Sequence, residues 1–554
     1  MTLDRLRCRG GFYVPSSQSM KELRAPEPGI APRIPATTAA ARPNVAGGRA
    51  PSRPRVRGGL LVAVLLLGAG LRLVSLGAVG LNSDEAVYMG QAAALAEAPE
   101  LESIFPVFRA HPLLSQSILA VLFRFGVSDL LGRLVAASFG IGTILLAYRV
   151  GQKLYGWWAG WLAALLLAVM PYHVIVSRQF LLDTPMAFFA TLTLLFLADL
   201  ATGEEPSRLS AAGAGLGLVF LSKETGLVLL AAVYVFLALS PGLRIRFRDL
   251  ALSLLVFGLV VAPYPLTLAL GGGAGAGRTQ QYLVWQLSRR PNHDWAFYPE
   301  VVGPSIGLAL LAAAVLGFLL LRRENSRKEI LLAAWILVPI LFFQLWPVKG
   351  FHYLLLIAPP LAVAAGRTLT RWPSAPSFRV RGREIHTSWV RLGLASFVAI
   401  SLLMPAWQGL ATRATGRFLA GSGGVPGGRE AGLWIRENTP SGATLMTIGP
   451  SMANILQFYG HRRAFGLSVS PNPLHRNPAY QPIRNPDFDL RTGEIQYVIW
   501  DAYSASRSTF FSAKILRYAE RYDGRVVHVE AVPLRSAEGE TISTPVIVVY
   551  EVRP

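Results

Sequence analysis

The chain has 554 residues, of which 52% are hydrophobic and only 15% charged, with a mean hydropathy of +0.41. A soluble chain carries about a quarter charged residues, so this composition argues against a soluble enzyme and predicts a protein with many membrane spans. The formal net charge is +21, but the Arg residues gather in short segments between apolar runs, as the positive-inside rule predicts, and not in a nucleic-acid-binding patch. The single cysteine, Cys8, excludes an intrachain disulfide framework.

The first segment, residues 1–57, is rich in Pro, Ala and Arg and has little apolar periodicity. We interpret it as a disordered cytoplasmic tail. It lacks the layout of a signal peptide, because the first apolar run begins only near Leu60. Arg53, Arg55 and Arg57 place the N-terminus inside, so a first spanning helix over residues 59–79 delivers the chain to the outer face.

Residues 58–412 contain the remaining apolar runs and are predicted to form the transmembrane domain. The stretch 112–125 is short and interrupted by polar residues, which favours an interfacial helix over a span. With that choice, the Lys and Arg clusters at 149–153, 244–248, 322–328 and 367–391 all fall on the inner face. The pattern predicts an α-helical polytopic protein with about 11 transmembrane helices and interfacial helices, with the N-terminus inside and the C-terminus outside.

The composition changes after Leu410, where long apolar runs give way to turns and short β-rich segments. Residues 444–448, 496–500, 526–529 and 545–550 read as strands, and residues 428–437 and 508–522 as helices. Helices that alternate with strands predict a small α/β domain. We therefore expect residues 424–554 to form a C-terminal extracytoplasmic α/β domain.

On this topology the conspicuous polar residues near helix ends gather on the outer face. Two adjacent carboxylates, Asp84 and Glu85, follow the first span, and carboxylates opposite cations at a membrane boundary indicate a site. A carboxylate can deprotonate an attacking hydroxyl, and Lys or Arg can stabilise a departing phosphate. The pattern favours group transfer from a lipid-linked phosphate donor, with these candidate residues: Asp84, Glu85, Tyr88, His111, Arg178, Asp183, Lys223, Arg290, Lys349 and Tyr353.

Each candidate also has an ordinary structural explanation. Asp84 and Glu85 could form a solvated helix end, and Arg178 with Asp183 an exposed ion pair worth less than about 1 kcal/mol. Lys223 could extend to the lipid headgroups, and His111 could simply begin a helix. Two other classes compete with an enzyme. A transporter or flippase of lipid-linked sugars predicts polar groups at the bilayer midplane and inverted repeats, and a membrane scaffold predicts no clustered charges.

Five short motifs give the chain a family resemblance over residues 60–410. They are Asp84-Glu85-Ala86-Val87-Tyr88, His111-Pro112-Leu113-Leu114, Ser177-Arg178 with Asp183-Thr184-Pro185, Ser222-Lys223, and His352-Tyr353 with Pro359-Pro360. With them the chain resembles the GT-C superfamily of polyprenyl-phosphate-dependent glycosyltransferases. Within that superfamily it is most similar to the bacterial relatives of protein O-mannosyltransferases and of the lipid A aminoarabinose transferase.

The resemblance implies an integral membrane enzyme that transfers a sugar, with inversion, from a polyprenyl phosphate to an extracytoplasmic acceptor, which could be a protein, a lipid or a glycan. It implies that Asp84 is the general base, assisted by Glu85. Arg178, Asp183, His111 and Tyr88 would shape the acceptor pocket. Face and charge, more than motif, suggest Lys223, Arg290, Lys349 and Tyr353 as contacts of the donor phosphate.

Two features depart from the family pattern or leave it open. The family often has Pro-Pro-Leu preceded by Lys, whereas this chain has Ala110-His111-Pro112-Leu113, so a phosphate-binding lysine is not carried over to this position. Some members of the superfamily use a divalent metal. Because the sequence contains no ligand cluster of convincing spacing, metal dependence stays open.

Overall fold

The computed structural model describes residues 54–107, 111–203, 208–270, 273–320, 326–373, 377–380, 383–411, 424–535 and 541–553. Most of the predicted tail therefore lies outside the described residues. Its last four residues, 54–57, belong instead to the first turn of α1 (Pro54–Leu73). This helix begins five residues before the predicted start and ends six residues before the predicted end, because the segment after Leu73 turns towards α2.

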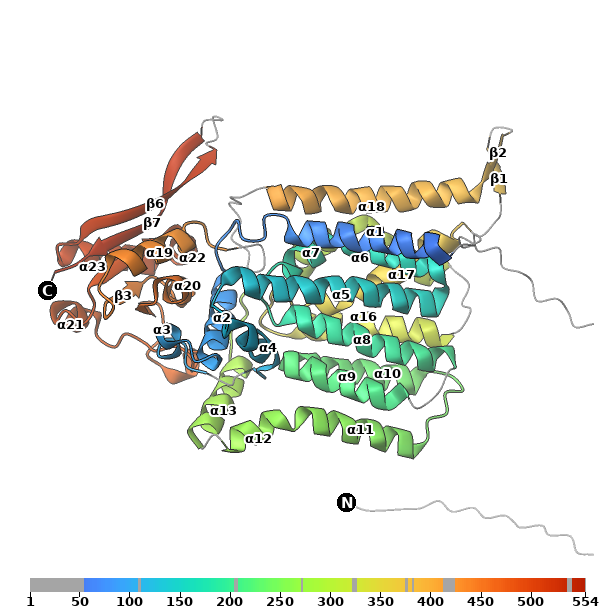
Figure 1. Cartoon of the computed structure of the whole chain (residues 1–554), viewed down its shortest axis with the longest axis horizontal. Coiled ribbons are helices and arrows are strands. Elements are labelled where there is room, and N and C mark those ends of the chain that lie inside the picture. Colours follow the sequence, from blue (N-terminus) through green and yellow to red (C-terminus); the bar gives the residue numbers. More distant parts are fainter. Residues whose placement is uncertain are drawn as a thin grey trace, which may run out of the picture. The chain divides into compact units, whose positions relative to one another are not determined.

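The region up to residue 411 is almost entirely helical (Figure 1). Helices α5, α8 and α9 pack side by side, and α11 packs on α9. The elements are α1 (Pro54–Leu73), α2 (Ser83–Leu95), α3 (Pro99–Glu102), α4 (Leu114–Phe123), α5 (Asp129–Tyr155), α6 (Trp157–Val169), α7 (Pro171–Ser177), α8 (Asp183–Thr202), α9 (Arg208–Ser222), η1 (Glu224–Leu227), α10 (Val228–Leu239), α11 (Phe247–Val261), α12 (Pro263–Leu270), α13 (Gly273–Leu287), η2 (Tyr298–Val302), α14 (Gly303–Ile306), α15 (Leu308–Leu320), α16 (Ser326–Leu345), η3 (Leu355–Ile357), α17 (Ala358–Arg371) and α18 (Thr387–Ala411).

Five of the described helices, α1, α5, α8, α16 and α18, are long and apolar enough to cross a membrane. Three bent pairs (α6 with α7, α11 with α12, and the segment Tyr298–Ile306 with α15) raise the number to as many as eight. The prediction of a helical protein with several membrane-crossing helices is therefore confirmed, while the count of eleven stays a prediction. The number of helices that pass by length and composition is below eleven, because several apolar helices, such as α9 and α10, are only 15 and 12 residues long.

Close contact between α5 and α6 depends on a glycine. A Cβ atom at Gly160 of α6 would lie 2.4 Å from the carbonyl oxygen of Tyr148 on α5, so only glycine allows the two backbones to approach this closely. Leu166, Leu167 and Ala168 continue the same helix into the buried core. The helices of this region are thus held by a tightly packed interior.

The C-terminal region folds into a five-stranded mixed sheet with helices. The strand order is β4-β3-β5-β7-β6, in which β4, β3 and β5 are parallel and β7 is antiparallel to both β5 and β6. Its elements are α19 (Gly428–Asn438), β3 (Thr444–Thr447), α20 (Pro450–Gly460), β4 (Arg463–Gly466), η4 (Pro473–His475), α21 (Pro486–Arg491), β5 (Tyr497–Asp501), α22 (Ala502–Arg507), α23 (Thr509–Arg521), β6 (Arg525–Arg535) and β7 (Thr541–Glu551). A separate hairpin, β1 (Ser377–Val380) with β2 (Arg383–His386), precedes α18.

Alternating side chains divide this sheet between two cores. On β3, Leu445 belongs to a cluster with Ile455 of α20, whereas its neighbour Met446 belongs to a cluster with Ile515 of α23. Successive residues of a strand point to opposite faces, so each face of the sheet buries its own set of apolar residues. Helix α20 and strand β4 lie between the predicted strands and were not expected from the sequence.

The C-terminal domain shares a core and polar contacts with α2 and the turn before it. Ala86 and Met89 of α2 are buried in the same cluster as Ile455 of α20. The Asn454 amide donates to Ser83 Oγ at 3.1 Å, and the Tyr459 hydroxyl accepts the backbone N–H of Leu81 at 3.0 Å. The domain therefore packs directly on the turn that carries Asp84.

Asp501, at the carboxyl end of β5, is a buried titratable group outside the membrane helices. Its Oδ1 accepts the backbone N–H of Ser504 at 2.6 Å and caps α22, whereas Oδ2 has no hydrogen-bond partner among the described residues. Burial raises the pKa of Asp501 from 3.8 to about 6. Between these two values the folded state keeps a proton that the unfolded state loses, so the free energy of unfolding falls as pH rises.

We therefore expect Asp501→Asn to stabilise the C-terminal domain above pH 6. The amide keeps the Oδ1 acceptor and removes the buried charge, a gain of up to about 3 kcal/mol for a pKa shift of this size. Hydrogen exchange of β5 in the full-length protein measures the effect. Exchange in the wild type should accelerate from pH 4 to 6 beyond the intrinsic rate, and the variant should lose that excess. The same acceleration in both proteins would contradict the assignment, and Glu437→Gln, an exposed change in the same domain, is the control.

Candidate active site

The turn that carries Asp84 is fixed by a capping box at the start of α2. Asn82 Oδ1 accepts the backbone N–H groups of Asp84 and Glu85, both at 3.0 Å, and Glu85 Oε2 accepts the backbone N–H of Asn82 at 3.1 Å. The Asn82 amide also donates to Gln179 Oε1 at 2.8 Å. This reciprocal pattern satisfies the free N–H groups of the first turn and attaches the turn to the segment after α7.

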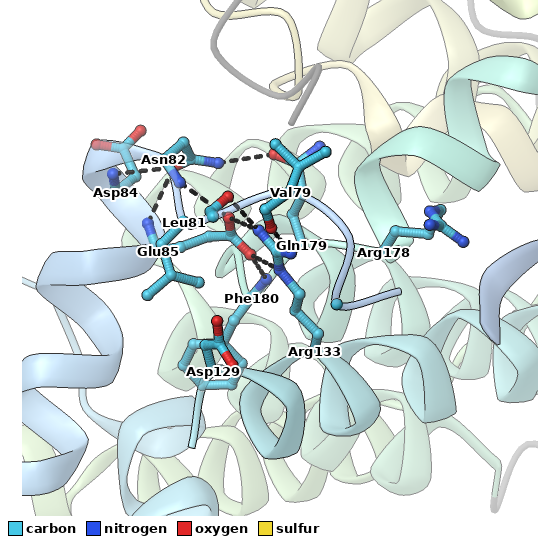
Figure 2. A network of polar contacts seen from close by, with 12 residues as sticks. Val79, Leu81, Asn82, Asp84, Glu85, Asp129, Arg133, Arg178, Gln179 and Phe180 are labelled. Atoms are coloured by element: carbon cyan, nitrogen blue, oxygen red, sulfur yellow. Dashed lines mark hydrogen bonds and ion pairs between the residues drawn. The ribbon is translucent and has the colours of Figure 1, made fainter. Parts of the chain in front are cut away.

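Glu85 is fully buried, and its carboxylate is engaged in hydrogen bonds with neighbouring residues (Figure 2). Arg133 of α5 donates to both carboxylate oxygens at 2.9 Å, and the backbone N–H of Phe180 donates to Oε1 at 3.1 Å. Arg133 also donates to the carbonyl oxygens of Leu76, Val79 and Gly80. The predicted role of Glu85 as an assisting base does not fit this geometry, and we reassign it as a positioning residue.

Asp84 is placed differently from its neighbour. Its side chain is only partly buried, and Figure 2 shows its carboxylate turned away from the Glu85–Arg133 network. No hydrogen bond or ion pair holds this carboxylate within the part of the chain that the structure describes. A carboxylate on a rigid turn, with its oxygens unengaged, is suited to accept a proton from a bound group.

Asp183, the first residue of α8, pairs with Lys223 and not with Arg178. Lys223 Nζ donates to the two Asp183 oxygens at 3.0 and 2.8 Å, and His352 Nε2 lies 3.6 Å from Asp183 Oδ2. All three side chains are buried. Lys223 therefore does not extend to the headgroups, and Asp183 neutralises much of its charge.

Arg178 does not line a pocket with Asp183 in this structure. Its guanidinium donates to the carbonyl oxygens of Leu71, Arg72 and Val74 at 2.8–3.0 Å, and to that of Ser75 at 3.2 Å. These carbonyls belong to the last turn of α1 and the residues after it, which lack intrahelical partners. Arg178 thus closes the end of α1, and we correct its predicted pocket role to a structural one.

His111 forms part of a polar group beside Tyr88. Its Nδ1 lies 2.7 Å from Glu224 Oε2, and its Nε2 lies 3.2 Å from the Tyr282 hydroxyl. The Tyr88 and His111 rings meet edge to face with centroids 6.0 Å apart. Burial, followed by the negative charge of Asp84, raises the pKa of Tyr88. The structure therefore brings His111 and Tyr88 together near Asp84, as predicted residues of one site.

Tyr353 links this group to the basic residues. Lys223 Nζ lies 4.6 Å from the centre of its ring. Burial raises the pKa of Tyr353, while the charges of Lys223 and Arg289 lower it and those of Asp183 and Asp84 raise it. Four charged groups from four segments of the chain therefore act on one phenol. Of these four groups, Lys223 lies directly against the Tyr353 ring.

The basic residue near Tyr353 is Arg289, whereas its neighbour Arg290 is exposed and has no side-chain partner among the described residues. Arg289 stacks on Trp285 with 4.7 Å between guanidinium and ring centre, and donates to Gln286 at 3.1 Å. Residues four positions apart lie on the same face of a helix, so the spacing of Trp285 and Arg289 in the sequence could have distinguished Arg289 from Arg290. We therefore place Arg289 in the site instead of Arg290.

Lys349 is buried and contacts the loop after α13. Its backbone N–H donates to Asn292 Oδ1 at 2.8 Å, and its carbonyl accepts from the Asn292 amide at 2.9 Å. Its Nζ lies 5.8 Å from the ring of Trp295. Lys349 thus fixes the loop that follows Arg289. Within the described ranges, no three His, Cys, Asp or Glu residues are grouped to hold a metal ion.

Comparison with known proteins gives one family model and several similar structures. Residues 110–266 match the model of the dolichyl-phosphate-mannose-protein mannosyltransferase family. Comparison with curated proteins gives no significant sequence match. The crystal structure of ArnT from Cupriavidus metallidurans bound to undecaprenyl phosphate is 16% identical with a TM-score of 0.64, and the match covers 90% of this chain and 98% of that one. Its apo structure gives the same TM-score at 17% identity, over 89% and 98% of the two chains.

A second similar structure is the oligosaccharyltransferase AglB from Archaeoglobus fulgidus, in complex with an inhibitory peptide and a dolichol-phosphate. It is 15% identical with a TM-score of 0.51, and the match covers 88% of this chain and 74% of that one. The similarity thus extends through nearly the whole of both chains in the case of ArnT. The chain has the fold of the ArnT and AglB structures, and residues 110–266 match a mannosyltransferase family model, so the resemblance drawn from its sequence motifs is confirmed.

Proposed function

We propose that the protein is an integral membrane glycosyltransferase that moves a sugar from a polyprenyl phosphate to an extracytoplasmic acceptor, with inversion. The observation that carries the proposal is the Asp84 carboxylate, which holds no hydrogen bond or ion pair among the described residues and stands on a rigid turn, together with the buried Lys223, which pairs with Asp183 and lies against Tyr353. A free carboxylate beside basic residues is the set that base-assisted transfer from a lipid phosphate requires. The lipid phosphates in the ArnT and AglB structures support a donor of this class.

The mechanism follows from these positions. The acceptor oxygen attacks the anomeric carbon while the bond from that carbon to the phosphate oxygen breaks, and polyprenyl phosphate departs. Asp84 takes the proton of the attacking hydroxyl. Arg289 and the Tyr353 hydroxyl stabilise the negative charge of the departing phosphate, with the Lys223–Asp183 pair behind them. Attack opposite the leaving group inverts the configuration at the anomeric carbon.

The direct test is release of polyprenyl phosphate by the purified protein, supplied with a panel of polyprenyl-phosphate sugars and a cell-envelope extract as acceptor source. We expect release with at least one sugar and only in the presence of extract. Absence of release with every donor would overturn the proposal. Protease protection of an epitope inserted after residue 553 in sealed vesicles tests the accompanying proposal that the C-terminal domain lies outside the cytoplasm.

The two adjacent arginines give a matched test of the donor site. We expect Arg289→Gln to raise the KM for the lipid donor by about tenfold or more, because it removes a charged hydrogen bond to phosphate. Arg290→Gln changes charge by the same amount one residue away and should stay within about twofold of the wild type. Equal effects of the two substitutions would show that both act through general surface charge.

A further inference from the structure

The segment that leads from α1 into Asp84 is held by side chains and not by regular secondary structure. Its residues 74–82 form no helix or strand, so their buried backbone polar groups need partners from elsewhere in the fold. Arg133 of α5 donates to three of the carbonyl oxygens. Further partners come from the C-terminal domain, so the backbone that carries Asp84 is supported from two separate parts of the chain.

Tyr459, near the end of α20, holds this segment through its hydroxyl group. The hydroxyl oxygen accepts the backbone N–H of Leu81 at 3.0 Å, and the hydroxyl donates to Asp129 Oδ2 at 2.8 Å. Leu81 is fully buried, so removal of the hydroxyl would leave a buried N–H unpaired. Tyr459 therefore joins the segment to the first turn of α5 through one atom.

Arg429 of α19 contacts the same segment. Its guanidinium donates to the carbonyl oxygens of Gly77 at 2.7 Å and of Val79 at 3.3 Å, and pairs with Asp129 Oδ2. This carboxylate oxygen therefore accepts from one side chain of α19 and one of α20. Asp129 lies four residues before Arg133 on the same face of α5. One face of α5 thus binds the segment directly and also anchors the two side chains from the C-terminal domain.

The backbones of the segment and of the C-terminal domain also meet directly. A Cβ atom at Gly424 would lie 1.6 Å from the carbonyl oxygen of Gly80, and one at Gly80 would lie 3.0 Å from Cβ of Arg429. Only glycine allows so close an approach at these two positions. Farther along, the Asn454 amide donates to Ser83 Oγ at 3.1 Å. The C-terminal domain therefore contacts the segment from residue 77 to residue 83, directly before the carboxylate of the candidate site.

We propose that Tyr459 and Arg429 are positioning residues for Asp84, which fix the backbone before it and so hold its carboxylate where the acceptor hydroxyl is deprotonated. The inference rests on the proposed function, and it makes the C-terminal domain part of the catalytic apparatus. Neither side chain touches the reacting atoms. Because a misplacement of about 1 Å can cost about a hundredfold in rate, a loosened segment should lower turnover and leave donor binding unchanged.

The test measures polyprenyl phosphate release and hydrogen exchange on the full-length protein in nanodiscs. Tyr459→Phe keeps the ring and removes both hydrogen bonds, and we expect kcat to fall by about tenfold or more at unchanged affinity for undecaprenyl phosphate. Exchange of residues 76–83 should accelerate while that of β3 stays the same. Arg429→Gln, a change at a half-buried position, should act in the same way. Tyr497→Phe in β5 and Arg517→Gln, an exposed position of α23, are the matched controls and should change none of these quantities.

Normal kcat in Tyr459→Phe would overturn the inference, whether or not exchange of the segment is faster. A loss of kcat with faster exchange throughout the C-terminal domain would also overturn it, because the hydroxyl would then only stabilise that domain. The same holds for a loss of kcat with unchanged exchange of residues 76–83. These results presuppose release by the wild type. Absence of release by the wild type with every donor would instead overturn the proposed function, and the inference with it.

Discussion

Asp84→Asn is expected to lower sugar transfer by at least about a hundredfold while leaving the fold intact. Asparagine has the same shape but cannot accept the acceptor proton. The structure gives two reasons to expect normal folding: the backbone N–H of Asp84 makes the capping bond to Asn82, and its carboxylate holds no partner among the described residues. The loss should therefore fall on turnover and not on stability.

Release of polyprenyl phosphate, measured beside the melting temperature of the purified protein, separates these two effects. The control is Glu102→Gln, which removes an exposed carboxylate from α3, the helix that follows α2. It should change neither quantity. Near-normal turnover in Asp84→Asn would contradict the assignment of Asp84 as the general base. An equally inactive Glu102→Gln would show that the assay responds to the charge of the whole segment.

The sequence allowed much of the architecture to be predicted, because the deciding signals are local. Four of the five strands of the C-terminal sheet overlap expected strands, although β6 and β7 are each 11 residues long and longer than expected. The overlap arises because β-branched runs between turns are visible in the chain itself. Strand β4 was not predicted, because Arg463-Ala464-Phe465-Gly466 is short and is a strand only through its pairing with β3. The motif resemblance likewise pointed to the right fold.

The site was harder, because its chemistry is decided by pairs that lie far apart in the chain. Glu85 meets Arg133 48 positions later, and Asp183 meets Lys223 40 positions later, distances at which no spacing rule applies. One local signal was present, since Asn82 and Glu85 have the three-residue spacing of a capping box. That spacing indicates that Glu85, but not Asp84, is already engaged in the turn.

The second large effect is expected at the Glu85–Arg133 pair. Arg133→Met should destabilise the protein by about 3–5 kcal/mol, because it leaves a fully buried carboxylate without its partner and the carbonyl oxygens of Leu76 and Gly80 without a donor. Arg124→Met, at an exposed position near the end of α4, is the matched control and should be close to neutral. Thermal unfolding in detergent, followed by size-exclusion chromatography, measures both.

Glu85→Gln then distinguishes a positioning role from a catalytic one. If Glu85 only holds the turn, the substitution should lower stability and activity together, and combining it with Arg133→Met should cost less than the sum of the single effects, because the buried charges are removed as a pair. If Glu85 instead takes part in proton transfer, activity should fall at unchanged stability. The first outcome is expected because the carboxylate already accepts bonds from Arg133, Phe180 and Asn82, and has no oxygen left for a substrate.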